Sequence, residues 1–505
     1  MPNLKGLFLA AVCTAATGFN ITAAERLVQQ LSLQDCINLA LQHNLNLQIE
    51  RRNPTRASYD ITAAQGNYYD PDLSFGAQTS SRVNALTLDS DNRLVPSSTS
   101  DSDNFNAGLS GTLPGMGTTY NIRANTGKTT GDNLSGSFTN ANGGSAIIIT
   151  QPLLKNFWID GGRLNIAQSR FNLEKAELGL KRQVMSIITQ VERAYYDLIY
   201  SYENVQVQEK SLQLAQRSLE ETQKRFEVGT VAELETKQTA SQVAAREADL
   251  LTARRNLELQ QNTLRRLISD NFAAIHGTQL SPTETLEAPV RVFDVQLSWD
   301  KGLSDRPDLN QARIDMESMG LTLKYNRNQL FPQLDLQGSY GLNGSSLNGY
   351  QGVFDNVSNR DLPNWFVGGV FSVPLGNRAA RSRYRSSQVQ EEQLLLTLKN
   401  LEQGIMVEID DAIKTAASSY DRVQATRKAR EYAEAALDAE QKRLENGKST
   451  AFFVLSLQND LTAARLSWIR SIADYNNALA ELSYREASTL TRHEITWDDS
   501  KMNRE

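Results

Sequence analysis

Apolar side chains recur every three or four positions along two long stretches that contain no proline. The first stretch, 161–226, carries this pattern from Val184 to Phe226, and the second, 378–445, carries it from Leu398 to Val423. A mean spacing near 3.5 residues is typical of a coiled coil. We therefore expect two long helices, each about 100 Å in length.

A glycine-containing turn follows each long helix. The turns cover 228–231 and 446–450, and apolar periodicity resumes after them over 232–268 and 451–488. The pattern thus predicts two helical hairpins, each with a long outgoing helix and a shorter return helix.

Two other regions alternate apolar and polar residues with a period of two, which predicts strands. They are 68–155 and 333–374, and the first is rich in Gly, Ser, Thr and Asn. Shorter helices are expected before each region, over 33–66 and 298–331. Pro54 should kink or break the first of these near Asn53.

The order of these elements occurs twice, which indicates an internal duplication. The sequence at 224–229 matches that at 442–447, and 151–153 matches 373–375. We expect a first repeat over 31–275, a linker over 276–297, a second repeat over 298–490 and a polar tail over 491–505.

Composition narrows the class of protein. The 505 residues contain no apolar run long enough for a transmembrane helix. Lys5 and the apolar stretch after it predict a secretory signal peptide over 1–24, against a buried N-terminal segment. Cleavage would remove Cys13 with the signal peptide, so the mature chain would contain Cys36 as its single thiol. The net charge of −6, the three scattered histidines and the lack of a phosphate loop give no support to nucleic-acid binding, a histidine-rich metal site or an enzyme.

The predicted strands are too few for one chain to close a barrel. An open sheet edge is costly in lipid because its backbone groups stay unpaired. If the strands enter a membrane, several chains must share one barrel. The alternative from the residues alone is a soluble β cap on a coiled coil.

The chain resembles the TolC family of outer-membrane efflux proteins over about 30–490. The resemblance rests on the duplicated element order and on short motifs: Leu33-Gln34-Asp35 with Ala40-Leu41 and Asn44, Gln151-Pro152-Leu153-Leu154, and Arg225-Phe226-Glu227-Val228-Gly229-Thr230. It implies a mainly α, internally duplicated fold with a transmembrane β-barrel part. Three chains would share a 12-stranded barrel, four strands each, joined to a trimeric α-barrel tunnel.

The resemblance also implies partners and a transport function without catalysis or a cofactor. A periplasmic adaptor and an inner-membrane transporter of the RND or ABC type would drive export of small molecules or proteins through the outer membrane. The insertion over 83–145 departs from the family. It contains a hairpin-like pair, 104–112 and 117–126, which either adds barrel strands or forms an extracellular loop.

Two sites follow from the hairpin turns. The turns are the only reversals at the ends of the long helices, so they are expected to form the periplasmic tip and to dock the adaptor through Val228, Gly229, Thr230, Gly447, Lys448 and Ser449. The family narrows its tunnel with acidic residues near these turns. Alignment on the two turn glycines places Glu235 and Phe453 at the constriction, an acidic and a hydrophobic one respectively.

Simpler interpretations stand beside these. The glycines are needed for the turns whether or not a partner binds, Glu235 fits a solvated helix face, and Phe453 fits packing between helices. Aromatic residues near the strand ends fit an interfacial girdle: Tyr68, Tyr69, Phe157, Trp158, Phe331, Trp365 and Phe366. The rival functions are a periplasmic coiled-coil adaptor and a surface structural protein, both disfavoured by the duplication.

Overall fold

The structure, a computed structural model, describes residues 28–84, 87–88, 94–95, 98–133 and 136–496. The expected signal peptide over 1–24 and Cys13 lie outside these residues. The chain divides into two compact units. Unit 1 is formed by the segments ending at Gln42, Val191–Glu287 and Thr426–Ala473, and unit 2 by His43–Gln190, Ala288–Ala425 and the segment from Asp474 onward.

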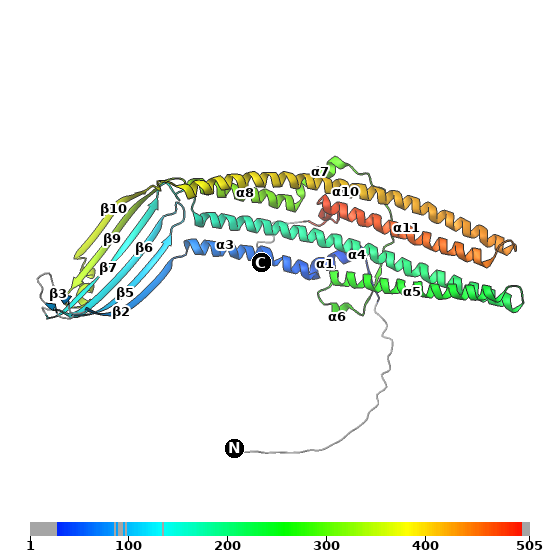
Figure 1. The fold of residues 1–505 in the computed structure, drawn as a ribbon, viewed down its shortest axis with the longest axis horizontal. Coiled ribbons are helices and arrows are strands. Elements are labelled where there is room, and N and C mark those ends of the chain that lie inside the picture. Colours follow the sequence, from blue (N-terminus) through cyan, green and yellow to red (C-terminus); the bar gives the residue numbers. More distant parts are fainter. Residues whose placement is uncertain (1–27, 85–86, 89–93, 96–97, 134–135, 497–505) are drawn as a thin grey trace, which may run out of the picture. The chain divides into compact units, whose positions relative to one another are not determined.

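Four helices dominate the chain and form two antiparallel hairpins (Figure 1). They are α4 (Gly161–Glu227) with α5 (Glu233–Ile268), and α10 (Arg378–Glu445) with α11 (Ala451–Arg485). The long helix α10 begins and ends where the apolar pattern indicates. The return helix α11 ends three residues earlier than expected, and Ala487 just beyond it has a positive φ of 59°, a left-handed conformation that an α-helix does not contain.

Unit 1 also contains a two-stranded parallel sheet that the sequence does not predict. Strand β1 (Val28–Leu31) pairs with β8 (Gln279–Pro282), which lies inside the expected linker 276–297. The buried Tyr195 of α4 donates its hydroxyl to the carbonyl of Leu31 at 3.0 Å. This contact ties the start of the described chain to the first long helix.

The single described thiol lies in the core beneath these strands. Cys36 is on α1 (Leu33–His43), is fully buried and forms no disulfide. Burial raises the pKa of its thiol to about 12, and the nearby Asp35 adds to this. Cys36 therefore acts as a small apolar core residue, and α6 (Phe272–Ile275) completes the helices of this unit.

Two of the predicted helices are each divided into shorter ones. The segment 33–66 is three helices, because α1 is followed by α2 (Leu45–Glu50), which Asn44 caps, and by α3 (Arg52–Tyr69). The break between α2 and α3 lies at Arg51, two residues before Asn53, which confirms the break expected near Pro54. Pro54 itself lies in the first turn of α3, where a missing N–H is tolerated. The segment 298–331 is likewise two helices, α7 (Val295–Asp305) and α8 (Pro307–Asn328).

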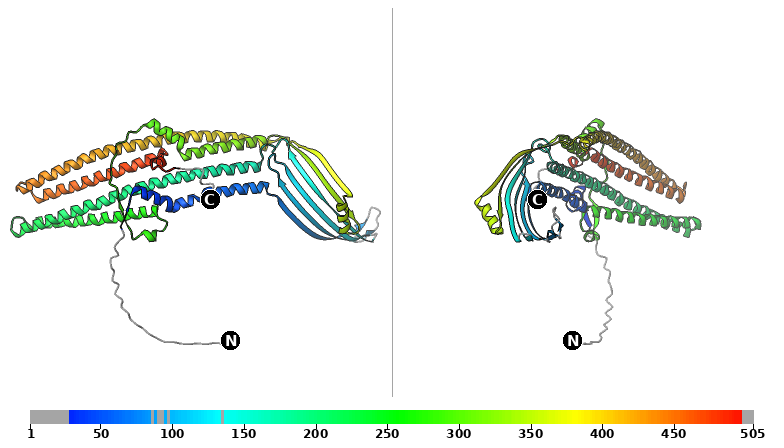
Figure 2. Two further views of the ribbon diagram at one scale, coloured as in Figure 1. Left: turned by 180° about the vertical axis from the view of Figure 1, so that it is seen from behind. Right: turned by 60° about the vertical axis from the view of Figure 1, so that its left-hand side comes forward.

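All six long strands form one antiparallel sheet in unit 2 (Figures 1 and 2), with the order β10-β9-β7-β6-β5-β2. The resemblance implied four strands per chain, and the structure corrects this to six. The insertion over 83–145 is therefore part of the sheet and not only a loop. The strands are β2 (Asp72–Asn84), β5 (Ser98–Thr112), β6 (Thr119–Asn133), β7 (Gly136–Pro152), β9 (Gln333–Ser346) and β10 (Leu362–Ser372), and a small hairpin of β3 (Thr87–Leu88) and β4 (Leu94–Val95) links β2 to β5.

Two short helices in unit 2 are also new. Helix α9 (Tyr350–Asn359) lies between β9 and β10, inside the region expected to contain only strands, and α12 (Thr489–Arg492) follows α11. The core of this unit includes Leu309, Ile405, Ile409 and Leu482. Gly302 of α7 lies so close to α10 that an added Cβ would approach Ile409 Cδ1 to 2.4 Å.

The duplication extends to backbone conformation. Asn156 and Asn377 each lie between a sheet strand and a long helix, four residues after Pro152 and three after Pro374, and both have positive φ, at 65° and 37°. Asparagine is among the few residues that adopt this region readily. Each exit from the sheet therefore contains an asparagine in the left-handed conformation.

Arg163 holds the first exit together. Its guanidinium donates to the carbonyls of Gly115, Asn156 and Phe157 at 2.6, 2.7 and 2.9 Å, and it pairs with Asp160 at 2.8 Å. Gly115 belongs to the turn between β5 and β6, so this side chain anchors the additional hairpin to the start of α4.

Candidate functional site: the hairpin turns and the two faces of the sheet

The two hairpin turns have the same hydrogen-bond pattern. In the first, Thr230 N donates to Arg225 O at 2.8 Å and Gly229 N to Phe226 O at 2.9 Å; in the second, Lys448 N donates to Arg443 O at 2.9 Å and Gly447 N to Leu444 O at 3.0 Å. These pairs define a Schellman cap, which needs a left-handed residue. Gly229 and Gly447 provide it, with φ of 74° and 68°.

The tips are open to solvent. A Cβ added at Gly229 or Gly447 would meet no heavy atom within 4 Å. Val228 is 73% exposed beside Gly229, although it is a large apolar residue. Thr230 and Ser449 use their hydroxyls within the turns, to Arg225 O at 2.8 Å and to the Glu440 carboxylate respectively. The tips thus present backbone and small side chains on two rigid caps.

Glu235 lies in a groove that residues of both hairpins line. Glu235 lies in the first turn of α5, is half-buried, and lines a groove of about 440 Å³ in unit 1 together with Thr450 and Phe452 of the second hairpin. Phe453 does not line this groove, although the two rings are similarly exposed, Phe452 at 60% and Phe453 at 57%. The two rings form an edge-to-face pair with centroids 5.9 Å apart.

Alignment on the turn glycines does not single out Phe452, which lines the groove with Glu235. Neighbouring residues on a helix point about 100° apart, so Phe452 lines the groove with Glu235 and Phe453 does not. The double aromatic Phe452-Phe453 was the available signal, but it could not distinguish the two rings.

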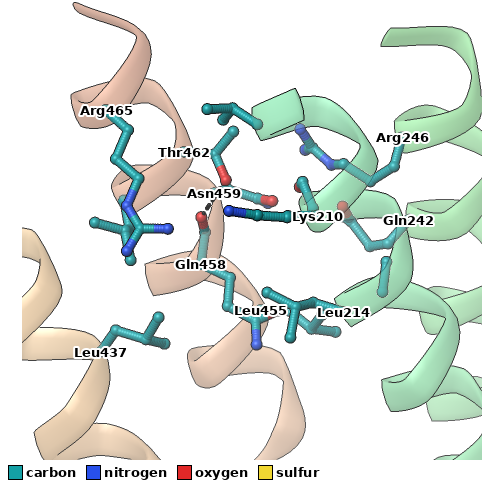
Figure 3. A pocket seen from close by; sticks show the side chains of 14 residues that line it. Lys210, Leu214, Gln242, Arg246, Leu437, Leu455, Gln458, Asn459, Thr462 and Arg465 are labelled. Atoms are coloured by element: carbon teal, nitrogen blue, oxygen red, sulfur yellow. Dashed lines mark hydrogen bonds between the residues drawn. The ribbon is translucent and has the colours of Figure 1, made fainter. Parts of the chain in front are cut away.

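A second groove of about 280 Å³ lies between the hairpins in unit 1. Figure 3 shows Lys210 of α4 extending toward Gln458 and Asn459 of α11, with Arg246 and Arg465 at the sides. Thr462 Oγ1 donates to the carbonyl of Gln458 at 2.8 Å. Polar side chains therefore line much of the facing surfaces of the hairpins here, beside a smaller apolar cluster of Leu437, Val454 and Leu461.

The sheet has one apolar and one polar face, because successive residues of a strand point to opposite sides. The strand registers place Leu73, Leu109, Ile122, Ile147, Tyr340 and Trp365 in a single row across the six strands. We call the side that carries this row the apolar face. The next row, on the polar face, includes Ser74, Gly108, Arg123 and Asn364.

The apolar face is broad and exposed. Phe75, Trp365 and Phe371 are 77%, 76% and 65% exposed. Along β9 it extends from Leu334 to Leu342, about 27 Å of strand, comparable with the apolar band of about 25 Å on outer-membrane barrels. An apolar surface of this extent on a water-soluble domain would be unusual.

The expected aromatic girdle is only partly present. Trp158 is 79% exposed and packs edge-to-face on Phe157 at 4.9 Å. Tyr68 instead donates its hydroxyl to Asp160 at 2.5 Å and is part-buried. Phe366 lies on the polar face, so it does not belong to such a girdle.

Nothing in the described part of the chain suggests a metal or a helical membrane span. Its acidic, histidine and cysteine side chains form no cluster of three that could hold a metal ion, and its helices include none long and apolar enough to cross a membrane.

Long helical hairpins joined to an amphipathic sheet with two unpaired edges define a class of membrane-channel subunit, and the comparisons agree. The chain matches the family described as Outer membrane efflux protein over residues 113–269 and 300–484. It belongs to that family. It is thus an outer-membrane efflux channel protein and not an enzyme, which confirms the expected fold class and localisation. No curated protein matches the chain significantly.

Solved structures share the fold across nearly the whole chain. The outer membrane channel CmeC of Campylobacter jejuni is 15% identical with a TM-score of 0.66, covering 99% of this chain and 96% of that one. VceC of Vibrio cholerae is 19% identical with a TM-score of 0.64, covering 90% and 95%. The open MtrE outer membrane channel of Neisseria gonorrhoeae is 16% identical with a TM-score of 0.63, covering 91% and 89%.

Proposed function

We propose that three copies of the chain form one channel that conducts substrates from a pump complex, in tripartite efflux or type I secretion, through the outer membrane. The observation that carries the proposal is the sheet: six strands with one apolar and one polar face, and unpaired edges at β2 and β10. In lipid these edges require partners, and β2 of one copy pairing with β10 of the next would supply them.

A shared barrel then has a definite size. Six strands from each of three copies make eighteen, within the range of known outer-membrane barrels. The apolar face meets lipid and the polar face lines the pore. Strands β5 and β6 have the same alternation as the other four, which supports their place in the wall.

The hairpin turns form the periplasmic tip in this proposal. Helices α4 and α10 have 67 and 68 residues, so each turn lies about 100 Å along its helix from the sheet exit. The exposed caps at Val228, Gly229, Thr230, Gly447, Lys448 and Ser449 dock a periplasmic adaptor, which couples the channel to an inner-membrane transporter of the RND or ABC type.

The constriction lies just inside the tip. Glu235 and Phe453 of three copies provide carboxylates that favour cations and rings that exclude water. Phe452 lines the same groove as Glu235 and is 60% exposed.

Native mass measurement after detergent extraction of outer membranes tests the assembly. We expect a single species with three times the mass of the mature chain. A monodisperse monomer would contradict the shared barrel and with it the proposed channel.

A further inference from the structure

Helix α9 lies on the apolar face of the sheet, on the side that meets lipid in the proposed channel. Its Val353 is only 4% exposed. A Cβ added at Gly143 or Gly344 would meet Val353 Cγ1 at 3.0 Å, and one added at Gly352 would meet the Ser346 hydroxyl at 2.2 Å. Figure 2 shows the helix beside the strands. The glycines therefore allow the helix to approach a part of the face that lacks large side chains.

A groove remains between α9 and the strands. It has a volume of about 780 Å³, within the usual range for small-molecule sites, and its walls are mainly apolar. Phe75, Phe105 and Ala107 form the strand side, and Tyr350, Phe354 and Val357 form the helix side. Phe105 and Tyr350 stack edge-to-face with centroids 6.1 Å apart.

The groove lies at the limit of the apolar surface. On one side it continues into the row that contains Leu109, Ile122 and Ile147. On the other side, the strand registers bring Thr79, Asp103 and Lys128 into one row, and Thr79 donates to Asp103 at 2.5 Å. An apolar groove that opens on a membrane-facing surface and ends at a polar row is complementary to a lipid. The apolar part suits the hydrocarbon chain, and the polar row suits the head group.

We propose that this groove binds an acyl chain of an outer-membrane lipid, and that α9 clamps the chain against the strands. The argument for lipid over a second protein is continuity, since the groove is part of the same apolar face that the proposed channel exposes to the bilayer. The inference therefore rests on the proposed function for the orientation of the sheet.

The experiment uses the full-length trimer in proteoliposomes that contain phosphatidylethanolamine with a photoreactive diazirine in its acyl chain. Labelled peptides are mapped by mass spectrometry. We expect adducts on residues 350–359 and around Phe105, in addition to adducts at Trp365 and Phe371 on the open apolar face. Ala107→Trp fills the groove and should reduce labelling of 350–359 severalfold without changing labelling at Trp365.

Ala146→Trp is the matched control, because it adds the same side chain to the polar face and should leave the labelling of α9 unchanged. Ala124→Phe serves as a second filling variant if Ala107→Trp fails to form trimers. Three outcomes would contradict lipid binding in the groove without contradicting the proposed channel. The first is a lack of adducts on α9 while Trp365 is labelled, and the second is undiminished labelling of α9 in both filling variants. The third is cross-linking between chains at α9. Absence of label at Trp365 and Phe371 as well would instead contradict the orientation of the sheet in the proposed channel.

Discussion

Arg306 determines how two helices of unit 2 meet. It precedes Pro307, which disfavours the helical conformation in the residue before it, and its backbone is extended, with φ −65° and ψ 123°. Its guanidinium donates to both carboxylate oxygens of Asp308, at 3.0 and 2.6 Å, and to Glu408 of α10 at 2.8 Å. A two-point contact of this kind fixes orientation as well as charge.

The pH dependence of this pair can be predicted. Burial opposes ionisation of Asp308, but the hydrogen bond and charge of Arg306 outweigh it and hold the pKa of Asp308 below its ordinary value of 3.8. Because the pKa of Asp308 is lower in the folded state than in the unfolded state, its ionised form stabilises the fold at pH values above the unfolded-state pKa. This stabilisation is lost as the pH falls through the folded-state pKa. Asp308→Asn should therefore reduce the free energy of unfolding at pH 7 by about 1.5 to 3 kcal/mol.

Thermal unfolding of the solubilised protein at pH 7 and pH 3 measures the effect. The gap in stability between Asp308→Asn and the wild type should narrow at the lower pH, because protonation of Asp308 in the unfolded wild-type chain then removes part of the stabilisation that its charge provides. Asp305→Asn, at an exposed position of α7, is the control and should change little at either pH. An equal gap at both values would show that the charge of Asp308 is not what stabilises the site.

At the scale of elements, variants of the hairpin turns can test adaptor docking without disturbing the fold of the hairpins. Bulky replacement of Gly229 and Gly447 together with Lys448→Glu should abolish export while leaving trimer levels intact. The added side chains meet open space, so their structural cost is the left-handed conformation, about 1–2 kcal/mol at each turn. Drug susceptibility of cells and the amount of trimer in membranes are the two measurements.

Gly115 offers a matched control for those glycines. It also has a positive φ, 115°, and open space around its Cβ position, but it belongs to the β5–β6 turn. The same bulky residue there should leave export unchanged. If the tip variants export normally, the adaptor docks elsewhere on the channel.

The constriction is tested by two neighbouring aromatic residues. Phe453→Ala should raise single-channel conductance in planar bilayers and sensitise cells to large antibiotics, because it removes a ring from the pore. Glu235→Gln should mainly reduce cation selectivity. Phe452→Ala is the comparison, since Phe452 lines the groove between the hairpins. A larger conductance change for Phe452→Ala would assign the narrowest point to Phe452. If none of the three variants changes conductance or selectivity, the constriction lies elsewhere in the channel.

Elements with a long, uniform pattern of apolar residues could be predicted from the sequence. Elements whose position depends on a single tertiary contact could not. The seam of α10 and the alternation in β2 and β9 extend over many residues, so each additional residue supports the same assignment. Helix α9 depends on close approach to Gly344, on the strand just before it, and to Gly143, which is distant in sequence. Within the site, the turn glycines follow from local chemistry, whereas the proximity of Glu235 to Phe452 depends on how two hairpins pack.

At the scale of the whole molecule, the additional hairpin β5–β6 should set the width of the barrel. Strand β2 runs antiparallel to β5, and β6 to β7, so deletion of 98–133 leaves β2 and β7 in opposite directions and able to pair. The barrel would fall from eighteen strands to twelve, and its diameter by about one third, since diameter is roughly proportional to strand number.

End-on views of the trimer by electron microscopy measure this diameter. The unaltered trimer, prepared in the same detergent, gives the reference, and the width of the helical tunnel gives an internal control in each image. A barrel of unchanged width after the deletion would place β5 and β6 outside the wall.

The unpaired edges at β2 and β10 also affect the kinetics of biogenesis. A single chain cannot place its own sheet in lipid without exposing two rows of backbone groups, so encounter between copies must precede or accompany insertion. The rate of barrel formation then rises more steeply than the first power of chain concentration, and a cell that makes few copies accumulates unassembled chains before it acquires channels. The unpaired strand edges of a single chain thereby make the number of channels depend on a threshold concentration of chains.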